Sequence, residues 1–535
     1  MASSSRIHAR EPVNSASGAE IDRTPEAIRA HLEDAAHFPG GRGDALARPR
    51  TEAEIASLVA GAESVLAIGA QSSVTGGATP AGGLILSTER LTTIEPDGEQ
   101  HVRAGAGVPL TRLQQALAAR GQWFPPAPTF TGAFVGGVAA TNAAGAATYK
   151  YGTTRAWVDG LTIVLACGHV LDFRRGEVVS GPDGFEIGCA HGLRTVEPGS
   201  YRMPDVPKCS AGYFAAPEMD LVDLFVGSEG TLGVIVQARL RVLPTPPALA
   251  FALVPVRSEP EALALVSELR RQSQSTWQTK DPRGVDVSAV EYLDRRSIEI
   301  LAKDGIDRRN DVSMPRGAEV ALLIQLELPA GTDAARAFEE IGAALEPDAP
   351  DTALGRFCRL LDSHGVLDAT ELAMPGDAQR AAQLLAFREG VPEGVNRRIG
   401  EAKRRIDPRV EKAAADMIVP YDRFADMMAM YREGYRRRGL DFAIWGHVSD
   451  GNVHPNAIPR SYEDVVAAKD AILEFGREVV RLGGSPLAEH GVGRSAVKQA
   501  LLRQLYGDAA IDEMRAIKRA LDPEWKLAPG VLFER

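Results

Sequence analysis

Two short segments near the C-terminus contain residue types that commonly hold a divalent metal. Segment 446–456 contains His447 and His454, and segment 489–493 begins with Glu489 and His490. Two imidazoles and a carboxylate suit a divalent metal that keeps open coordination positions, and a further imidazole beside them can serve as a base. For either segment alone, ordinary loop histidines and a surface Glu-His pair remain an equal alternative.

Three glycine-rich segments lie far upstream of these histidines. In the first, an apolar run at 64–68 leads into a Gly/Ser/Thr loop at 69–77, whose bare N–H groups and hydroxyls suit a pyrophosphate. In the second, 125–155, small residues dominate, so that the backbone can lie flat against a ligand. The third, 226–235, is a glycine-rich turn that enters a β-branched strand. The first loop does not form the G-x-G-x-x-G fingerprint of nicotinamide dinucleotide sites.

Together these segments resemble the FAD-binding fold of the vanillyl-alcohol oxidase superfamily. Within it, they are most similar to the D-2-hydroxyacid dehydrogenases, which include D-lactate dehydrogenase, the glycolate oxidase FAD subunit and D-2-hydroxyglutarate dehydrogenase. The resemblance runs from the region of Ala45 to the C-terminus. It implies an α+β fold, in which a two-subdomain FAD-binding domain of the PCMH type is joined to a cap domain with an antiparallel sheet covered by helices.

The resemblance also implies an activity and roles for individual residues. The activity is oxidation of a small D-2-hydroxy acid, such as D-lactate or glycolate, to the 2-oxo acid, with hydride passing to flavin N5. His447, His454 and Glu489 correspond to the metal ligands, and His490 corresponds to the base. The FAD contacts are expected at Gly69, Gln71, Ser72, Ser73, Pro128, Thr129, Gly136, Gly137, Asn142, Gly145, Gly152, Glu229, Gly233 and Ile235.

Arg388 corresponds to the family's clamp on the substrate carboxylate. It lies in a helical segment that we expect to break at Pro392. A guanidinium fork offers a carboxylate two parallel hydrogen bonds. An ordinary surface ion pair is the alternative for Arg388. Tyr213 likewise fits either an active-site loop or the core.

No histidine or cysteine stands where the covalent members of the superfamily attach FAD, so the resemblance implies non-covalent FAD, together with a divalent metal such as zinc or manganese. Two departures bear on affinity and substrate. Segment 67–71 lacks the arginine and the additional glycines usual in the phosphate loop. Ala414 stands where the D-2-hydroxyglutarate enzymes carry a lysine for the second carboxylate, which favours a monocarboxylate substrate.

Two other functions remain open. A flavin-dependent transferase similar to alkylglycerone-phosphate synthase would usually show consecutive histidines in the cap, and the sequence contains no such run. A non-catalytic FAD subunit of a redox complex would not require the intact set of histidines and Glu489.

Composition excludes several classes of protein. A net charge of −11 argues against a nucleic-acid partner. The four cysteines show no C-x-x-C spacing, so neither an iron–sulfur module nor a disulfide framework is expected. The chain has no apolar run of about 18 residues that would predict a membrane span. We therefore expect a cytoplasmic protein, free or peripheral to a membrane, that passes electrons to a separate cytochrome, quinone-linked protein or flavoprotein. A homodimer is left open.

The distribution of glycines, prolines and apolar runs predicts four parts. These are a flexible tail at 1–21, the FAD-binding domain at 22–247, the cap domain at 248–500, and a C-terminal helix and tail at 501–535 that return to the FAD domain. Within the FAD-binding domain, Leu110, Leu113 and Leu117 predict one face of a helix that Gly121 ends. The apolar runs on either side of 166–169 predict a β-hairpin.

Overall fold

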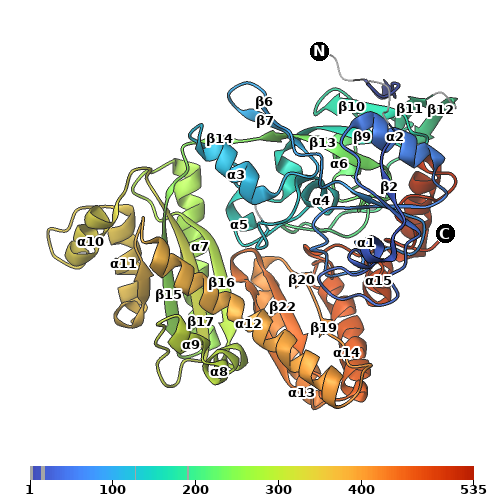
Figure 1. Cartoon of the computed structure of the whole chain (residues 1–535). Coiled ribbons are helices and arrows are strands. Elements are labelled where there is room, and N and C mark those ends of the chain that lie inside the picture. Colours follow the sequence, from blue (N-terminus) through green and yellow to red (C-terminus); the bar gives the residue numbers. More distant parts are fainter. Residues whose placement is uncertain (1–3, 14–17, 127, 190–191) are drawn as a thin grey trace. The chain divides into compact units, whose positions relative to one another are not determined.

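The computed structural model describes residues 4–13, 18–126, 128–189 and 192–535 (Figure 1). The chain divides into two compact units. Unit 1 comprises Met1–Gly145, Gly152–Pro244 and Ser485–Arg535, and unit 2 comprises Ala146–Tyr151 and Thr245–Gly484. The chain thus returns to unit 1 at Ser485, earlier than the predicted return after residue 500. The excursion of Ala146–Tyr151 into unit 2 was not predicted.

Unit 1 contains two principal sheets. The five-stranded sheet has the order β10-β9-β13-β7-β6 and is antiparallel throughout. The four-stranded sheet has the order β2-β3-β5-β4, and its last three strands run parallel. The strands are β2 (Ile21–Asp22), β3 (Ala45–Ala47), β4 (Val65–Ile68), β5 (Leu84–Ser87), β6 (Ile94–Pro96), β7 (His101–Gly105), β9 (Val158–Val164), β10 (Val170–Arg174) and β13 (Val234–Arg241).

Smaller sheets and helices complete unit 1. Strands β1 (Arg6–His8), β11 (Phe185–Cys189) and β12 (Gly192–Val196) form one small sheet, and β8 (Gln122–Trp123) pairs with β14 (Leu243–Pro244). The helices are α1 (Pro25–Arg29), α2 (Glu52–Gly61), α3 (Leu110–Ala118), α4 (Val135–Ala140), η1 (Thr154–Trp157), α6 (Leu221–Phe225) and α15 (Ala496–Leu521).

The local predictions for unit 1 are confirmed where the pattern was strong. Leu110, Leu113 and Leu117 are buried on one face of α3, and Gly121 follows that helix with a φ of 66°. Strands β9 and β10 form the expected hairpin, with Val164 opposite Val170. Both elements depend on contacts between close neighbours in sequence, which periodicity reports directly.

The prediction of a flexible tail over 1–21 does not hold for the residues of β1. This strand pairs in parallel with β11, and Arg6 forms an ion pair with Glu186 at 2.8 Å. The partner strand lies 180 positions further along the chain, so no local pattern could predict the pairing. Residues 1–3 and 14–17 of the predicted tail lie outside the described residues.

Unit 2 is built on an antiparallel sheet with the order β18-β15-β17-β16-β21-β22-β19, and β20 also pairs with β22. This is the sheet with covering helices that the sequence predicted for the cap. The strands are β15 (Ala248–Val256), β16 (Val287–Asp294), β17 (Val320–Leu328), β18 (Glu371–Ala373), β19 (Ala413–Ala414), β20 (Met417–Ile418), β21 (Phe442–His447) and β22 (Asn452–Ala457). The helices are α5 (Thr148–Tyr151), α7 (Glu259–Thr279), α8 (Arg295–Asp304), α9 (Ile306–Arg309), α10 (Ala334–Ala343), α11 (Ala353–Ser363), η2 (Leu367–Ala369), α12 (Ala378–Arg405), η3 (Tyr421–Arg423), α13 (Phe424–Arg437), η4 (Val448–Asp450) and α14 (Tyr462–Arg481).

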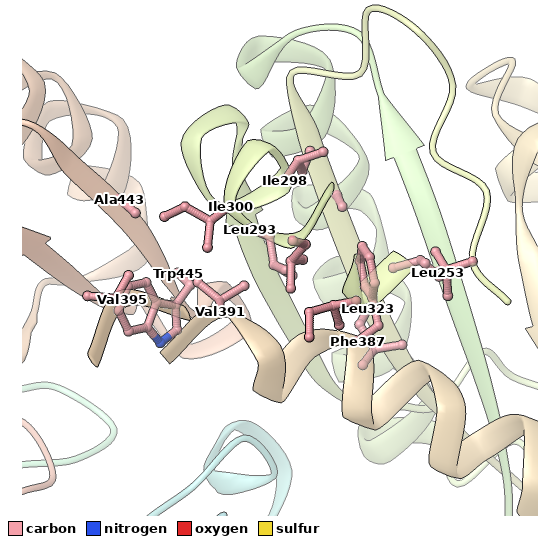
Figure 2. Close-up of a cluster of buried hydrophobic side chains, with 14 of the residues drawn as sticks. Leu253, Leu293, Ile298, Ile300, Leu323, Phe387, Val391, Val395, Ala443 and Trp445 are labelled. Atoms are coloured by element: carbon pink, nitrogen blue, oxygen red, sulfur yellow. The ribbon is translucent and has the colours of Figure 1, made fainter. Parts of the chain in front are cut away.

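The long helix α12 packs on this sheet. Figure 2 shows Phe387 and Val391 of α12 among Leu253 of β15, Leu293 of β16 and Leu323 of β17, all in one buried cluster. The expected helix break at Pro392 is wrong, because α12 continues through it to Arg405. Apolar packing on both sides of the proline outweighs the single backbone hydrogen bond that proline cannot make.

The short helix α5 anchors the Ala146–Tyr151 excursion in unit 2. Lys150 Nζ lies 2.7 Å from Asp286 and 2.5 Å from Glu327, and the Tyr151 hydroxyl donates to Glu327 at 2.6 Å. These charged contacts hold the excursion to β17 and to the residue that precedes β16. Across the described ranges, none of the helices combines the length and apolar character needed to cross a bilayer.

Replacing Pro392 with alanine should increase the free energy of unfolding by about 1–3 kcal/mol, because alanine restores an N–H donor for the Arg388 carbonyl and a helix-interior proline costs about 3 kcal/mol relative to alanine. Urea denaturation measures the change. The exposed neighbour Glu393 supplies the control, since Glu393→Ala should stay within about 0.5 kcal/mol of wild type. A Pro392→Ala variant no more stable than wild type would show that the proline is accommodated without cost.

Candidate active site

Unit 1 contains a cavity of about 340 Å³. Its walls come from the loop after β4, the 128–144 region including α4, the start of β13, and the pair Glu489 and His490. The predicted FAD contacts that line it are Gly69, Gln71, Ser72, Ser73, Pro128, Thr129, Gly136, Gly137, Glu229, Gly233 and Ile235.

The other predicted FAD contacts, Asn142, Gly145 and Gly152, do not line this cavity. Asn142 is buried, with a φ of 48°, and its side-chain oxygen accepts the N–H of Arg155 at 2.9 Å. In the structure its side chain therefore orders the turn behind the cavity wall.

The lining of the cavity suits a flat aromatic ring and a pyrophosphate. A Cβ on Gly136 would lie 2.6 Å from the Cβ of Ala106, so only glycine lets α4 pack this closely against Ala106. A Cβ on Gly137 would meet nothing within 4 Å, which leaves backbone facing open space. Among the described residues, no acceptor is bonded to the backbone N–H groups of Ser72 or Ser73. Such N–H groups are the usual partners of phosphate oxygens.

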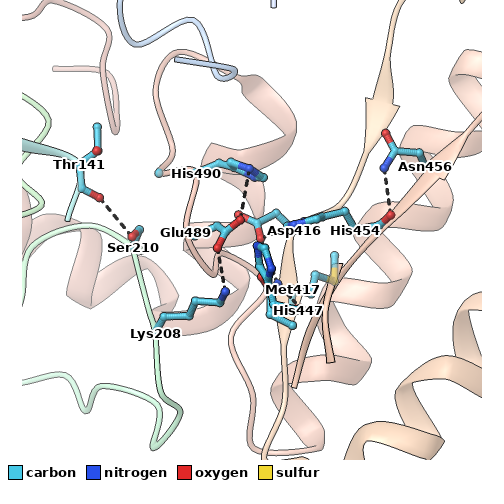
Figure 3. A network of polar contacts seen from close by, with 12 residues as sticks. Thr141, Lys208, Ser210, Asp416, Met417, His447, His454, Asn456, Glu489 and His490 are labelled. Carbon is cyan, nitrogen blue, oxygen red and sulfur yellow. Dashed lines mark hydrogen bonds and ion pairs between the residues drawn. The ribbon is translucent and has the colours of Figure 1, made fainter. Parts of the chain in front are cut away.

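Glu489 and His490 lie on the wall of this same cavity. Glu489 is only 7% exposed, and its Oε2 accepts a hydrogen bond from Lys208 Nζ at 2.7 Å. Its Oε1 lies 3.6 Å from His490 Nε2 (Figure 3). The alternative of a surface Glu-His pair is therefore wrong for Glu489. Sequence reasoning missed Lys208, because no motif surrounds it and its partner is 281 positions away.

Glu229 secures the loop that follows His490. Its carboxylate accepts the backbone N–H groups of Val492 and Gly493, each at 2.8 Å. Burial raises the pKa of Glu229 to about 7, although these two N–H groups act in the opposite direction. Glu229 thus lines the predicted flavin cavity and also fixes the backbone beside His490.

In unit 2, a buried carboxylate links Arg388 to His447. Glu291 Oε2 lies 2.7 Å from Arg388 Nε, and Glu291 Oε1 lies 2.5 Å from His447 Nδ1. Burial alone would raise the pKa of Glu291, but the charge of Arg388 and the contact with His447 lower it well below its usual range. Histidines that bind metals commonly form such a carboxylate contact through the other ring nitrogen. Glu291 was not predicted from the sequence.

Arg388 is a buried residue rather than a surface one, with 8% of its side chain exposed. Its guanidinium contacts Glu291 and also Glu389, whose side chain is 41% exposed and lies 2.7 Å away. The surface-ion-pair alternative is therefore wrong about exposure, whereas the pairing itself is present.

His454 and its neighbours form the other part of the unit 2 site. The ring centroids of His447 and His454 are 5.5 Å apart, and His454 Nδ1 lies 3.5 Å from Asp416 Oδ1. Asn456 donates to the His454 carbonyl at 2.9 Å (Figure 3). The described part of unit 2 thus presents two imidazoles and the carboxylate of Asp416. Asp416 was not predicted as a site residue, although an acidic residue within the apolar stretch 413–419 is a signal for one.

Tyr213 belongs to the core of unit 1. It is fully buried, burial raises its pKa, and its hydroxyl lies 2.7 Å from Thr231 Oγ1. Of the two alternatives left open by the sequence, the structure supports the core tyrosine.

Comparison with known proteins identifies the family. The model of the FAD linked oxidases, C-terminal domain, matches residues 246–532, which is more than half of the chain. The model of the FAD binding domain matches residues 43–174. The chain therefore belongs to the FAD-linked oxidase family, and the FAD-binding α+β fold expected from its motifs is confirmed.

Several curated proteins are similar over most of their length. D-lactate dehydrogenase of Archaeoglobus fulgidus is 29% identical and covers 87% of this chain and 85% of its own. D-2-hydroxyglutarate dehydrogenase of Xanthomonas citri is 28% identical, over 92% of this chain and 89% of its own. Glycolate oxidase subunit GlcD of Bacillus subtilis is 26% identical, over 92% and 89%. A solved structure of alkyldihydroxyacetonephosphate synthase has a TM-score of 0.57 at 14% identity, covering 95% of this chain and 82% of its own, which shows a shared fold alone.

Glu291→Ala should lower the free energy of unfolding by about 3–5 kcal/mol, because the buried guanidinium of Arg388 loses its ion pair with Glu291 and keeps the one with the more exposed Glu389. The double variant Glu291→Ala/Arg388→Met should recover much of this loss. Since the pKa of Glu291 is lowered on folding, its contribution is present above the ordinary carboxyl pKa of about 4.3 and is lost as pH falls below it. Denaturant unfolding at neutral and acid pH measures both effects. Equal stability of the single and double variants would contradict the pairing.

Glu229 should make stability fall as pH rises from about 5 to 8. Its pKa is raised on folding, so its favourable contribution is complete below the ordinary carboxyl pKa of about 4.3 and is lost as pH rises through about 7. Thermal unfolding across this range should show Glu229→Gln gaining on wild type with rising pH, whereas Glu95→Gln, at an exposed position of β6, should run parallel to wild type. Parallel curves for Glu229→Gln would show that this carboxyl does not titrate there.

Proposed function

We propose that this protein oxidises a small D-2-hydroxy acid, such as D-lactate or glycolate, to the 2-oxo acid with bound FAD as the hydride acceptor. One observation carries the proposal: Glu489 and His490 line the same unit 1 cavity as most of the predicted FAD contacts. A proton acceptor beside a flavin is what oxidation of an alcohol requires. The names of the relatives, two of them dehydrogenases of 2-hydroxy acids, support the substrate class.

FAD, when bound, accepts the hydride from the carbon that carries the hydroxyl. We propose that N–H groups of the 69–77 loop hold its pyrophosphate and that the backbone at Gly136 and Gly137 faces its ring system. We also propose that binding is non-covalent. No cysteine is among the described residues that line the cavity, and the histidine there, His490, is assigned another role.

We propose that His447, His454 and Glu489 bind a divalent metal, zinc or manganese, with Asp416 as a further candidate ligand. Imidazole and carboxylate donors suit both ions. When bound, the metal supplies positive charge that polarises the hydroxyl and carboxylate oxygens of the substrate. Of the proposed ligands, His447 and His454 belong to unit 2, and Glu489 belongs to unit 1. Support from within unit 2 comes from Glu291, whose contact with His447 Nδ1 fits a ligating histidine.

His490 is proposed as the base. Its Nε2 faces Glu489 Oε1, so we assign the proton from the substrate hydroxyl to Nδ1, and the carboxylate then stabilises the imidazolium. Arg388 is proposed as the carboxylate clamp. Its contact with the half-exposed Glu389 is the replaceable one, so a substrate carboxylate can take the place of Glu389 while Glu291 keeps the guanidinium in position.

Mixing the FAD-loaded protein with D- and L-2-hydroxy acids without oxygen tests the function. D-lactate or glycolate should bleach the flavin, the L-acids should not, and a chelator should slow the reaction. Because we propose a separate electron acceptor, artificial dyes should support turnover and NAD should not. Absence of bleaching by any 2-hydroxy acid would favour the non-catalytic FAD subunit. The transferase alternative has only the shared fold in its favour.

Variants should separate the metal ligands from the base. His454→Ala and Glu489→Ala should each lower bound metal and turnover while flavin is retained. His490→Ala should keep more of the metal but lose roughly 10²–10⁴-fold in the rate of flavin reduction, the usual contribution of a general base. Metal analysis beside single-turnover kinetics measures both effects. His37→Ala is the matched control, because the side chain of His37 is 78% exposed. Wild-type metal content and rates in all three site variants would contradict the mechanism.

A further inference from the structure

We propose that Lys208 is a positioning residue, which holds the Glu489 carboxylate in the orientation needed for a metal ligand. Lys208 acts through Glu489 and is not assigned any contact with substrate or flavin. This inference rests on the proposed function, because Glu489 is a proposed ligand there.

The geometry of the pair supports this role. The Lys208 side chain is 0% exposed, and its Nζ lies 2.7 Å from Glu489 Oε2. The other carboxylate oxygen, Oε1, is the one near His490 (Figure 3). One oxygen is thus directed to the lysine and the other to the base, which fixes the plane of the carboxylate. An ammonium group is costly to bury unless it is paired, so the contact with Glu489 offsets part of the cost of burying Lys208.

The backbone next to Lys208 is tied to both sides of the cavity wall. Ser210 N donates to the Leu487 carbonyl at 3.2 Å, just before Glu489 in the chain. Ser210 Oγ donates to the carbonyl of Thr141, a cavity-lining residue, at 3.2 Å (Figure 3). Lys208 therefore extends from a fixed point of the wall, and a longer or shorter side chain there would reach a different position.

A second contact holds the other end of the same loop. The carboxylate of Glu229 accepts the N–H groups of Val492 and Gly493. Glu229 acts on the backbone after His490, whereas Lys208 acts on the Glu489 side chain before it. Of Lys208 and Glu229, only Lys208 contacts the Glu489 carboxylate itself, so only its loss should change the orientation of that group directly. Contacts that orient metal ligands typically contribute about 10–100-fold to metal affinity.

A double-mutant cycle on the full-length, FAD-loaded protein tests the role of Lys208. The variants are Lys208→Met, Lys208→Arg, Glu489→Gln and the double variant Lys208→Met/Glu489→Gln, with Lys303→Met at an exposed position as the control. Titration with zinc and with manganese against a competing chelator gives metal affinity, and anaerobic flavin reduction by D-lactate gives the limiting rate constant of reduction and the apparent Kd for D-lactate. Lys208→Met should lower metal affinity by about 10–100-fold. Lys208→Arg should restore part of it, and Lys208→Met should change nothing further in the Glu489→Gln background.

Each contrary outcome has a distinct meaning. Wild-type metal affinity in Lys208→Met overturns this inference and leaves the proposed function standing. Equal losses from Lys208→Met with and without Glu489 also overturn it, because the lysine would then act elsewhere. If Lys208→Met does not fold, Lys208→Arg and the charge-neutral double variant carry the test. A wild-type protein that binds neither metal overturns the metal-assisted function and this inference together.

Discussion

An ionised carboxylate is costly to bury unless a cation or hydrogen-bond donors offset its lost hydration, and Lys208 does so for Glu489 at the wall of the unit 1 cavity. The pair needs two distant segments, 208–210 and 485–489, to be brought together. Backbone contacts of Ser210 and the two N–H groups that Glu229 accepts complete that junction. His490 thereby reaches a cavity whose other walls are made of glycine-rich loops. His490 and the cavity proposed for the flavin are consequently parts of one unit.

Unit 2 also contains a buried carboxylate that is paired with a cation. Glu291 is buried between Arg388 and His447, so the proposed clamp and a proposed metal ligand share one carboxylate. The chain passes between the units at Gly145, Tyr151, Pro244 and Gly484, and Lys150 fixes the first excursion to Asp286 and Glu327 of unit 2. The cavity-lining residues Ala143 and Ala144 are thus close in the chain to a segment anchored in unit 2.

Local patterns predicted much of this molecule. Apolar spacing located α3, alternation and a glycine turn located the β9–β10 hairpin, and runs of small residues located most of the cavity lining. What could not be predicted depends on contacts between distant residues. Lys208 meets Glu489 across 281 positions, and β1 pairs with β11 far along the chain. Glu291 became visible as a site residue only when β16 was placed beside β21. The predicted helix break at Pro392 was wrong because the rule that proline ends a helix does not take account of the packing of Val391 and Val395.

The central proposal is that His447, His454 and Glu489 bind one divalent metal. X-ray absorption at the metal edge of the FAD- and metal-loaded protein tests it most directly, because imidazole rings scatter in a recognisable pattern. The account predicts two imidazole nitrogens and carboxylate oxygens in the first coordination shell, at about 2.0–2.2 Å for zinc. A shell of oxygen alone, without imidazole scattering, would contradict it.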